Sequence, residues 1–416
     1  MKLSAVRLAH EPNRVVDVWL QNGKIADISR SAQVHSDLVL LPGLVDLHTH
    51  LREPGGEDAE DISSGTLAAI AGGFTDVFAM PNTTPAVDTV EQVVHQRHLA
   101  RNAQARVHPI AAATLGRMGN ELVDVAALRD QGVHIFSDDG SCLDDPQLVR
   151  QLLTQLAKLG GVFAQHAQSM TLAGNGVANA RVASALGVAP WPASAEETVI
   201  ERDIALAEAT GGHLHVCHVS SAGSVEILRR AKQRGAPVTA EVAPHHLMLT
   251  DASLRSDTGI FKVNPPLRSK SDVDAVREGL RDGTIDIVAT DHAPHPGHRK
   301  IGPLADAVFG FTALETALSV VAEVLEDENG EPNWALVAAV LSHRPAAIGG
   351  ISHHAGRAIR VGEPATCTLV RAGTQYTVSA NEHVSRSRNT PFAGMQLRHR
   401  VRSVWVEGIQ VLSTSF

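Results

Sequence analysis

Eight short apolar segments alternate with longer, helix-like segments through the middle of this 416-residue chain. Segments without a polar face are typical of parallel strands that helices cover on both sides. Eight of them predict an α/β fold of the (β/α)8 type, a TIM barrel, with a doubly wound open sheet as the alternative. The predicted strands are Leu44–Leu47, Thr75–Met80, Val107–Ala111, Val133–Phe136, Val162–Gln165, Leu214–Val219, Pro237–Glu241 and Ile285–Thr290.

Capping residues delimit some of the intervening helices. Asp61 is a suitable N-cap for a helix over Ile62–Ala71, which Gly72 would end. Helical periodicity also predicts helices over Leu148–Leu159 and Val225–Arg234. The chain has no GxGxxG motif after an early strand and no Walker motif, which weakens the open-sheet alternative.

The two ends of the chain follow a different pattern. Residues 1–43 alternate apolar and polar side chains, with turns predicted at Gln21–Gly23 and around Ser31–Val34. Residues 357–416 alternate in the same way. We expect antiparallel strands from both ends to form one small β-sandwich, while residues 44–356 form the barrel. The strands expected near the C-terminus are Ala365–Val370, Tyr376–Val378 and Val401–Val406.

Composition argues against several classes of protein. The net charge of −9, the aromatic fraction of 3% and the single tyrosine, Tyr376, do not fit a nucleic-acid-binding surface. Three widely spaced cysteines without a CxxC pattern argue against a disulfide framework or a thiolate metal site. The N-terminus does not resemble a signal peptide, and no run of 18 apolar residues occurs. We expect a cytoplasmic protein with no membrane and no nucleic-acid partner.

Histidine and aspartate residues stand at the carboxyl ends of five of the eight predicted strands. These ends meet at one mouth of a barrel, where active sites form. Imidazoles and carboxylates together suit a hard-to-borderline divalent metal. In an extended segment, residues two apart point the same way, so His48 and His50 can bind one ion. The candidate ligands are His48, His50, Asp139, His166, His218 and Asp291.

Each ligand signal has a structural alternative. An HxH pair is often coincidental, a lone strand-end histidine such as His166 can be structural, and Asp138–Gly140 also fits a turn. Their joint occurrence favours the metal. Six ligands exceed the four of one tetrahedral zinc, which favours two ions roughly 3.5–4 Å apart. Asp291 would then move the proton from water to a leaving nitrogen.

Several segments resemble the amidohydrolase superfamily and, more closely, the class I dihydroorotases. The resemblance covers nearly the whole chain. The run from His48 through Arg52 with its following Glu-Pro-Gly, together with MPNT and VNPPLR, separates this family from other metal-dependent barrels. The similar segments are GLVDLHTHLREPGGE, GGFTDVFAMPNTTP, FSDDG, VCHVSSAGSVEIL, TAEVAPHHLMLTD, KVNPPLR, ATDHAPH and SRSRNTPFAG.

The resemblance implies two Zn²⁺ ions per subunit, bridged by Asp139 and hydroxide. His48, His50 and Asp291 would bind one ion, and His166 and His218 the other. Many superfamily members use a carboxylated strand-4 lysine as the bridge, but this chain has no lysine between Lys24 and Lys158. The implied catalytic residue is Asp291, and the implied substrate contacts are His50, Arg52, Asn82, Asn264, His295 and the backbone of Phe309 and Gly310.

The implied reaction is zinc-dependent, reversible hydrolysis of (S)-dihydroorotate to N-carbamoyl-L-aspartate in de novo pyrimidine (UMP) biosynthesis. Arg52 suits a substrate carboxylate because a guanidinium donates two parallel hydrogen bonds. A salt bridge at the rim is the alternative for Arg52, and Asn82 and Asn264 could be turn formers beside prolines. The family also implies a homodimer and aspartate transcarbamoylase as a partner.

Departures from the family pattern occur close to these positions. Gln168 stands where an acidic residue is common after the histidine, His295–Lys300 is poor in acids, and Val308 replaces a proline. Substrate identity therefore has an alternative, a hydantoinase or allantoinase, although such proteins more often supply the strand-4 lysine. A non-catalytic, dihydroorotase-like scaffold of aspartate transcarbamoylase is the alternative from another class, but such chains are expected to lose ligands that are all kept here.

Overall fold

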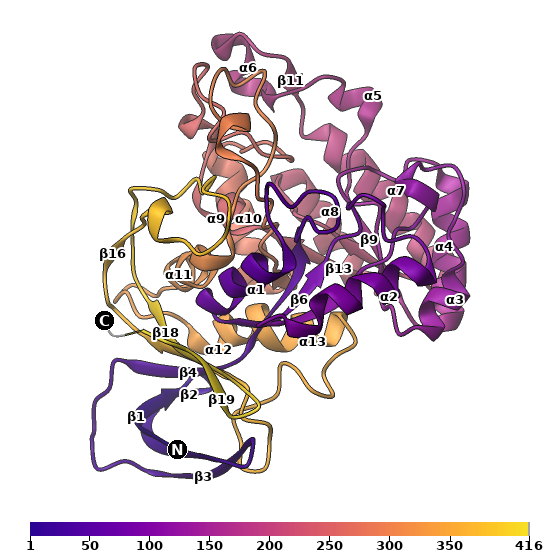
Figure 1. Ribbon diagram of the computed structural model, residues 1–416. Helices are drawn as coiled ribbons and strands as arrows, with labels where there is room; N and C mark the ends of the chain where they lie inside the picture. The colour runs from indigo at the N-terminus through magenta and orange to yellow at the C-terminus, as the bar shows by residue number, and fades with distance from the viewer. Residues whose placement is uncertain (415–416) are drawn as a thin grey trace.

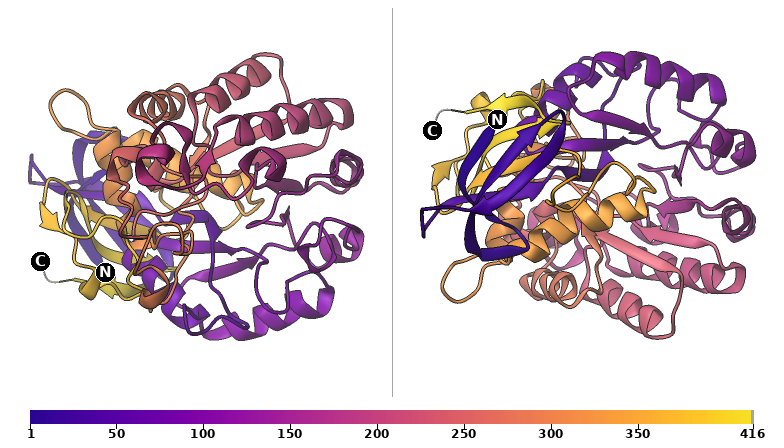
Figure 2. Two further views of the ribbon diagram at one scale, coloured as in Figure 1. Left: turned by 90° about the horizontal axis from the view of Figure 1, so that it is seen from above. Right: turned by 90° about the horizontal axis from the view of Figure 1, so that it is seen from below.

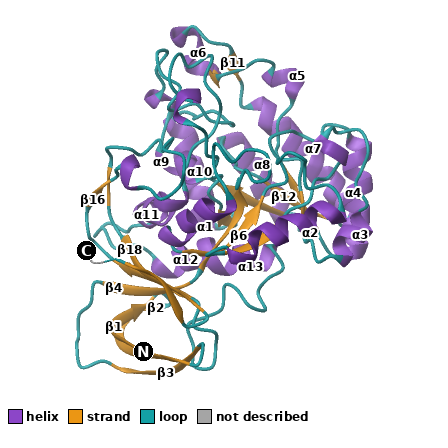
Figure 3. Ribbon diagram, viewed as in Figure 1, coloured by secondary structure: helices purple, strands orange, loops and turns teal. Residues whose placement is uncertain are grey.

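Parallel strands with helices between them form the centre of the computed structural model, which describes residues 1–414 (Figures 1 and 3). Five strands pair in the order β14-β13-β12-β9-β8 and three in the order β5-β6-β7, every pair parallel. Each predicted apolar segment overlaps one of these strands, which confirms the α/β class. The strands are β5 (Leu44–Thr49), β6 (Phe74–Ala79), β7 (Arg106–Pro109), β8 (Ile135–Phe136), β9 (Val162–Gln165), β12 (His213–Val216), β13 (Val238–Val242) and β14 (Ile287–Val288).

Isolated parallel bridges connect the edges of these two sheets. Ala111, just after β7, pairs with Phe136 of β8. Thr49 of β5 pairs with His292, which follows β14, and the N–H of His50 donates to the His292 carbonyl over 2.9 Å. The edge of one sheet at β7 therefore lies beside β8 of the other sheet, and the edge at β5 lies beside the segment that follows β14.

Helices lie outside the parallel strands, as the two views along the vertical axis show (Figure 2). The predicted helix over Ile62–Ala71 has these bounds, and the Asp61 side chain accepts from the Ser64 N–H at its start. The other two predicted helices are confirmed with shifted ends. The helices are α1 (Ile62–Ala71), α2 (Val90–Leu99), α3 (Val125–Asp130), α4 (Pro146–Leu159), α5 (Met170–Ala173), α6 (Ala180–Leu186), α7 (Ser194–Thr210), α8 (Ala222–Gln233), α9 (Pro244–Met248), α10 (Lys270–Asp282), α11 (Leu314–Val324), α12 (Trp334–Ala338) and α13 (Arg344–Ile348).

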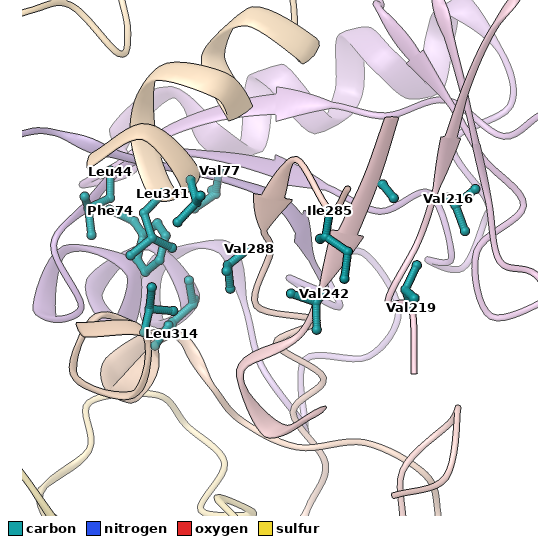
Figure 4. Packing of buried hydrophobic residues seen from close by; sticks show 14 of the residues in the cluster. Leu44, Phe74, Val77, Val216, Val219, Val242, Ile285, Val288, Leu314 and Leu341 are labelled. Atoms are coloured by element: carbon teal, nitrogen blue, oxygen red, sulfur yellow. The ribbon is translucent and has the colours of Figure 1, made fainter. Parts of the chain in front are cut away.

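Both faces of most of these strands are buried, which is why apolar residues predominate in their sequences. Within β6, Val77 packs into the core between strands and helices, whereas its neighbour Phe78 joins a second cluster on the opposite face. Figure 4 shows part of the first cluster, in which Leu314 of α11 and Leu341 pack near Phe74 of β6. This packing fixes the strand ends that carry the site.

Strands from both ends of the chain share a seven-stranded sheet, in the order β19-β18-β15-β4-β1-β2-β3. Its pairs are antiparallel except β1–β4, which is parallel. The prediction of antiparallel pairing is wrong for β1–β4, because residues 31–37 cross over instead of forming a hairpin. The strands are β1 (Lys2–Leu8), β2 (Glu11–Gln21), β3 (Lys24–Arg30), β4 (Leu38–Pro42), β15 (Cys367–Arg371), β18 (Arg400–Val406) and β19 (Ile409–Ser413).

Two short pairs lie apart from these sheets. β16 (Tyr376–Thr377), expected to join the other terminal strands, pairs instead with β17 (Gln396–Leu397) in a separate two-stranded sheet. β10 (Ala178–Asn179) pairs with β11 (Pro190–Trp191) in an excursion between β9 and α7 that also contains α5 and α6. In Figure 1 this excursion and the terminal sheet lie at opposite ends of the molecule. None of the helices within residues 1–414 combines the length and apolar character needed to span a bilayer.

Candidate metal centre and substrate pocket

The six predicted metal ligands come together at the carboxyl ends of the parallel strands. Nε2 of His48 lies 3.3 Å from Oδ1 of Asp139 and 3.5 Å from Oδ1 of Asp291. Nε2 of His50 lies 3.4 Å from Oδ2 of Asp139 and 3.3 Å from Oδ1 of Asp291. The two histidines of the HxH pair therefore face the same two carboxylates.

His166 and His218 also lie close to Asp139. Nδ1 of His166 lies 3.3 Å from Oδ1 of Asp139 and 2.8 Å from Nε2 of His218. Nε2 of His218 lies 3.8 Å from the same carboxylate oxygen. Asp139 thus contacts both pairs of histidines, which is the arrangement that a bridging carboxylate requires.

These donor atoms fit divalent metal ions. Two ligand atoms that are each about 2.1 Å from a tetrahedral ion are about 3.4 Å apart, close to the 3.3–3.5 Å that separates His48 and His50 from their carboxylates. Nε2 of His48 is buried and has no hydrogen-bond partner within residues 1–414. A buried polar atom without a partner is costly, and a metal ion would satisfy it. Groups that could hold an ion include His48–His50–Asp291 and His48–Asp139–His218.

Glu241 of β13 orients the first of these histidines, and the sequence analysis missed its role. Its Oε1 lies 2.6 Å from Nδ1 of His48, and its Oε2 lies 3.0 Å from Nε2 of His215. A carboxylate on the outer ring nitrogen of a ligating histidine fixes the tautomer and ring orientation. The available signal was an acid at the end of an otherwise apolar strand.

Gln168 plays a similar part for His166. Its Oε1 lies 2.7 Å from Nε2 of His166, so that Nδ1 is the nitrogen that faces Asp139. The same oxygen accepts from Nδ2 of Asn264 over 2.9 Å. Gln168, at which the sequence departs from the family pattern, therefore links His166, a candidate metal ligand, to Asn264, a candidate substrate contact.

The electrostatics of the cluster keep its carboxylates ionised. Burial alone would raise the pKa of Asp139, but His48, His166 and His218 outweigh it and hold that pKa well below its usual value. Burial would likewise raise the pKa of Asp291, and His48 and His50 lower it. For His48, burial lowers the pKa, but Asp139 and Glu241 outweigh burial and raise it well above its usual value.

A pocket of about 470 Å³ opens over the cluster. Every predicted site residue except His48, which is fully buried, contributes to its wall. This is the arrangement expected of a substrate site above metal ions. The lining residues are His50, Arg52, Asn82, Asp139, Gly140, His166, His218, Asn264, Asp291, Ala293, His295, Ala307, Val308, Phe309 and Gly310.

Arg52 is a largely buried cation in this wall whose contacts are to uncharged groups. Its Nε donates to the Pro294 carbonyl over 3.2 Å, and Nη2 lies 3.5 Å from Nε2 of His295. Burial lowers the pKa of Arg52 to about 10, so it stays charged at neutral pH. Burial and then Arg52 lower the pKa of His295 to about 3, so this imidazole is neutral. The rim salt bridge considered as the alternative for Arg52 is not formed within residues 1–414, and an anionic ligand would supply its counter-charge.

The two asparagines, Asn82 and Asn264, differ in what their side-chain oxygens contact. Oδ1 of Asn82 lies 2.9 Å from Nδ1 of His50, so this side chain orients a ligand candidate. Oδ1 of Asn264 is buried and has no hydrogen-bond partner within residues 1–414. An acceptor without a partner in a pocket wall suits a ligand N–H group.

The backbone of Phe309 and Gly310 is engaged within the protein in this conformation. The Phe309 carbonyl lies 2.7 Å from Nε2 of His295, and the Gly310 N–H donates to the Lys262 carbonyl over 3.0 Å. Gly310 has a φ of +126°, and a Cβ there would lie 2.8 Å from the Cβ of Ala293. Glycine is therefore required here, and substrate contact with this backbone requires these bonds to be exchanged.

Three site residues other than glycine have positive φ angles: Arg52 (63°), His218 (33°) and Asp291 (46°). This region is unfavourable for residues with a side chain, and such strain is concentrated at functional sites. The strained backbone turns each side chain into the pocket directly after its strand.

The fold matches known structures. The solved structure of L-hydantoinase (dihydropyrimidinase) from Arthrobacter aurescens has a TM-score of 0.85 at 22% identity, covering 100% of this chain and 96% of that one. A dihydropyrimidinase from Brevibacillus agri has a TM-score of 0.83 at 22% identity, covering 99% of this chain and 95% of that one. At 22% identity this likeness shows the fold alone, an α/β fold that the chain shares with both proteins.

Sequence relatives show the family to which this chain belongs. A family profile described as dihydro-orotase-like matches residues 37–224. A protein named dihydroorotase from Streptomyces coelicolor is 51% identical over 374 residues, which cover 89% of this chain and 87% of the relative. Another of that name from Mycobacterium tuberculosis is 44% identical over 405 residues, which cover 94% of each chain. This chain belongs to the dihydroorotase family.

Proposed function

We propose that this protein is a dihydroorotase, which hydrolyses (S)-dihydroorotate reversibly to N-carbamoyl-L-aspartate in pyrimidine biosynthesis. The observation that carries the proposal is a buried arginine with uncharged contacts beside six converging histidine and aspartate ligands. The substrate combines a carboxylate, which Arg52 can bind, with a cyclic amide, which a metal site can polarise. Relatives named dihydroorotase at 44–51% identity support the same activity.

The site is proposed to hold two Zn²⁺ ions with Asp139 between them. His48, His50 and Asp291 are the ligands of one ion, and His166 and His218 are those of the other. The distances of 3.3–3.5 Å around His48 and His50 support this division. When bound, the ions would polarise the ring amide carbonyl and lower the pKa of water towards neutrality.

Arg52 and Asn264 position the substrate in this scheme. The Arg52 guanidinium donates to the substrate carboxylate, which gives it the direct ion-pair contact that it lacks within residues 1–414. Oδ1 of Asn264, which lacks a partner within residues 1–414, accepts from a ring N–H. His295, neutral at pH 7, and Asn82 complete the polar wall, while Phe309 and Gly310 form its far side.

Asp291 carries the proton. Its lowered pKa keeps the carboxylate ionised and able to accept a proton from the attacking water. In hydrolysis, the Asp291 carboxyl then donates that proton to the ring nitrogen as the C–N bond breaks. In ring closure, the same carboxylate accepts the proton from the ureido nitrogen of N-carbamoyl-L-aspartate as the C–N bond forms. The Asp291 carboxyl then donates that proton to the carboxyl oxygen that leaves as water.

We further propose that the two parallel sheets form one closed (β/α)8 barrel over residues 44–356. The bridges Ala111–Phe136 and Thr49–His292 support closure at both junctions. Residues 1–43 and 357–414 are proposed to form the composite β-sandwich, which a common core of side chains from β1, β2, β4, β15 and β18 supports. Residues 415 and 416, which the prediction from the sequence also includes, lie outside the described residues. A homodimer and association with aspartate transcarbamoylase remain predictions from the family.

Turnover of a substrate panel tests the proposed activity. Purified, zinc-supplied protein is incubated with L-dihydroorotate, hydantoin and allantoin, and its metal content is measured on the same sample. We expect turnover of dihydroorotate alone. Activity only on hydantoin or allantoin would refute the substrate and keep the metal chemistry, whereas inactivity on all three with no bound metal would favour the non-catalytic scaffold.

A further inference from the structure

A second group of metal-ligand side chains lies well away from the pocket. Asp76 of β6, His108 of β7 and His354, which follows α13, place their donor atoms within 4.8 Å of one another. Asp76 precedes Asn82 of the pocket by six residues along an extended strand and its exit, which is about 20 Å. The group is therefore separate from the catalytic cluster.

The two imidazoles of this group face one carboxylate oxygen. Nε2 of His108 lies 2.9 Å and Nε2 of His354 lies 3.5 Å from Oδ1 of Asp76. The second distance is close to the roughly 3.4 Å expected between two ligands of a tetrahedral ion, and the first would need to widen by about 0.5 Å. Arg106, whose Nε also donates to Oδ1 of Asp76 over 2.9 Å, would have to release that oxygen before all three atoms could bind one ion.

Ring stacking holds the imidazoles in this orientation. The ring of His108 stacks on Phe78 with centroids 4.8 Å apart and planes at 26°. The ring of His354 stacks on His108 at 5.6 Å and 29°. Because the rings are nearly parallel, both Nε2 atoms point to the same side, towards Asp76. Such ordering reduces the entropy lost when a ligand binds.

Charge balance does not require both histidines. Arg106 already pairs with Asp76 through two hydrogen bonds, from Nε to Oδ1 and from Nη2 to Oδ2, each 2.9 Å long. Two further imidazoles at the same carboxylate therefore exceed what its neutralisation needs. The simpler interpretation is a hydrogen-bonded cluster built around a buried acid, and it makes a different prediction about metal binding.

Solvent reaches the group through a surface groove. The groove has a volume of about 470 Å³ and includes His108 and His354, whose side chains are 20% and 29% exposed. Asp76 is fully buried and does not line the groove itself. Two imidazole nitrogens and one carboxylate oxygen suit Zn²⁺, Cu²⁺ or Ni²⁺ better than Mg²⁺ or Ca²⁺.

We propose that Asp76, His108 and His354 form a second binding site, for one borderline divalent cation, at the surface opposite the substrate pocket. Water completes the coordination of the ion. The ion would tie the segment after α13, which leads to β15 of the terminal sheet, to the parallel strands β6 and β7. The site is independent of the proposed activity.

Metal counting with matched variants tests this site. The zinc-supplied protein is titrated with Cu²⁺, and bound copper is counted by equilibrium dialysis while its electron paramagnetic resonance spectrum is recorded. We expect wild-type protein to bind one equivalent more than His354→Ala, with a spectrum showing two nitrogen ligands. Turnover of dihydroorotate should be unchanged in this variant, because His354 is remote from the pocket.

His353→Ala is the control, since this neighbouring side chain is exposed and lies 2.8 Å from Nδ1 of His354 without belonging to the group. The His353→Ala protein should still bind the additional equivalent of Cu²⁺. Equal copper counts in wild type and His354→Ala would overturn the proposal, and loss in His353→Ala as well would assign binding to the exposed histidine pair. Should His354→Ala fail to fold, His108→Gln makes the same comparison.

Discussion

Replacement of Arg52 by glutamine tests how the substrate is recognised. The structure places this guanidinium in the pocket wall with only a carbonyl and a neutral imidazole as hydrogen-bond contacts. In the proposed complex it donates two hydrogen bonds to the substrate carboxylate. Each hydrogen bond to a charged group contributes about 1.5–3 kcal/mol, so that losing both costs about 3–6 kcal/mol. At about 1.4 kcal/mol per factor of ten, kcat/KM for dihydroorotate should fall by roughly 10²–10⁴-fold.

The assay compares two ligands in both proteins. Dihydroorotate is compared with 5,6-dihydrouracil, the same ring without the carboxylate, either as a substrate or as a competitive inhibitor. Arg52→Gln should lower kcat/KM, or the affinity, for dihydroorotate by the factor above. The same quantity for dihydrouracil should stay within a few-fold of its wild-type value. The thermal midpoint should change little, because the substitution removes a buried charge whose direct contacts within residues 1–414 are to uncharged groups.

Equal losses for the two ligands would refute this reasoning. Such a result would mean that Arg52 supports the pocket wall, through Pro294 and His295, instead of binding the carboxylate. The difference between the two losses, and not the size of either one, is therefore the quantity to measure.

Four further predictions follow from the site and the core. Asp291→Ala should lower kcat by about 10²–10⁴-fold while metal content by atomic absorption stays near wild type; retained turnover would exclude Asp291 as the proton carrier. His48→Ala should abolish turnover and lower the metal content, because its Nε2 faces both carboxylates of the cluster; unchanged metal content would contradict its role as a ligand. Burial and then the nearby Lys262 lower the pKa of Lys300 to about 7. Between pH 7 and about 10.5 the unfolded chain therefore binds more protons than the folded protein, and the free energy of unfolding should rise with pH by up to about 1.4 kcal/mol per pH unit. Denaturant titrations of Lys300→Met should lack that slope. Leu341→Ala, in the fully buried core, should lower the free energy of unfolding by about 2–5 kcal/mol, and a loss below 1 kcal/mol would contradict the tight packing in Figure 4.

Local patterns were sufficient to predict the parallel strands and to single out the six side chains that converge at their carboxyl ends. In β6, four of the six residues of Phe74–Ala79 are apolar because the two faces of the strand pack into different clusters, and this signal is contained in the segment itself. The candidate ligands could be recognised because each lies at the carboxyl end of such a strand or within three residues after it. The bounds were less predictable, since strand pairing depends on distant partners; β14 is only two residues long in a longer apolar segment.

Long-range contacts could not be predicted in this way. The contact of Glu241 with His48 joins residues 193 positions apart, and nothing in either segment alone indicates it. The parallel pairing of β1 with β4 depends on the path of residues 31–37, whose composition indicates only a turn. The positive φ angle of Arg52 is likewise imposed by the surrounding fold, because the residue itself disfavours it. The role of Gln168 emerged only when its oxygen was found between His166 and Asn264.

In the proposed active site, Asp139 lies between two metal ions and Arg52 binds the substrate carboxylate. A crystal structure of the zinc-supplied protein with N-carbamoyl-L-aspartate, measured at the zinc absorption edge, tests it most directly. We predict two anomalous peaks roughly 3.5–4 Å apart, one beside His48 and His50 and one beside His166 and His218, with the ligand carboxylate on the Arg52 guanidinium. A ligand bound with its carboxylate away from Arg52, or no anomalous peak at Asp139, would contradict the account.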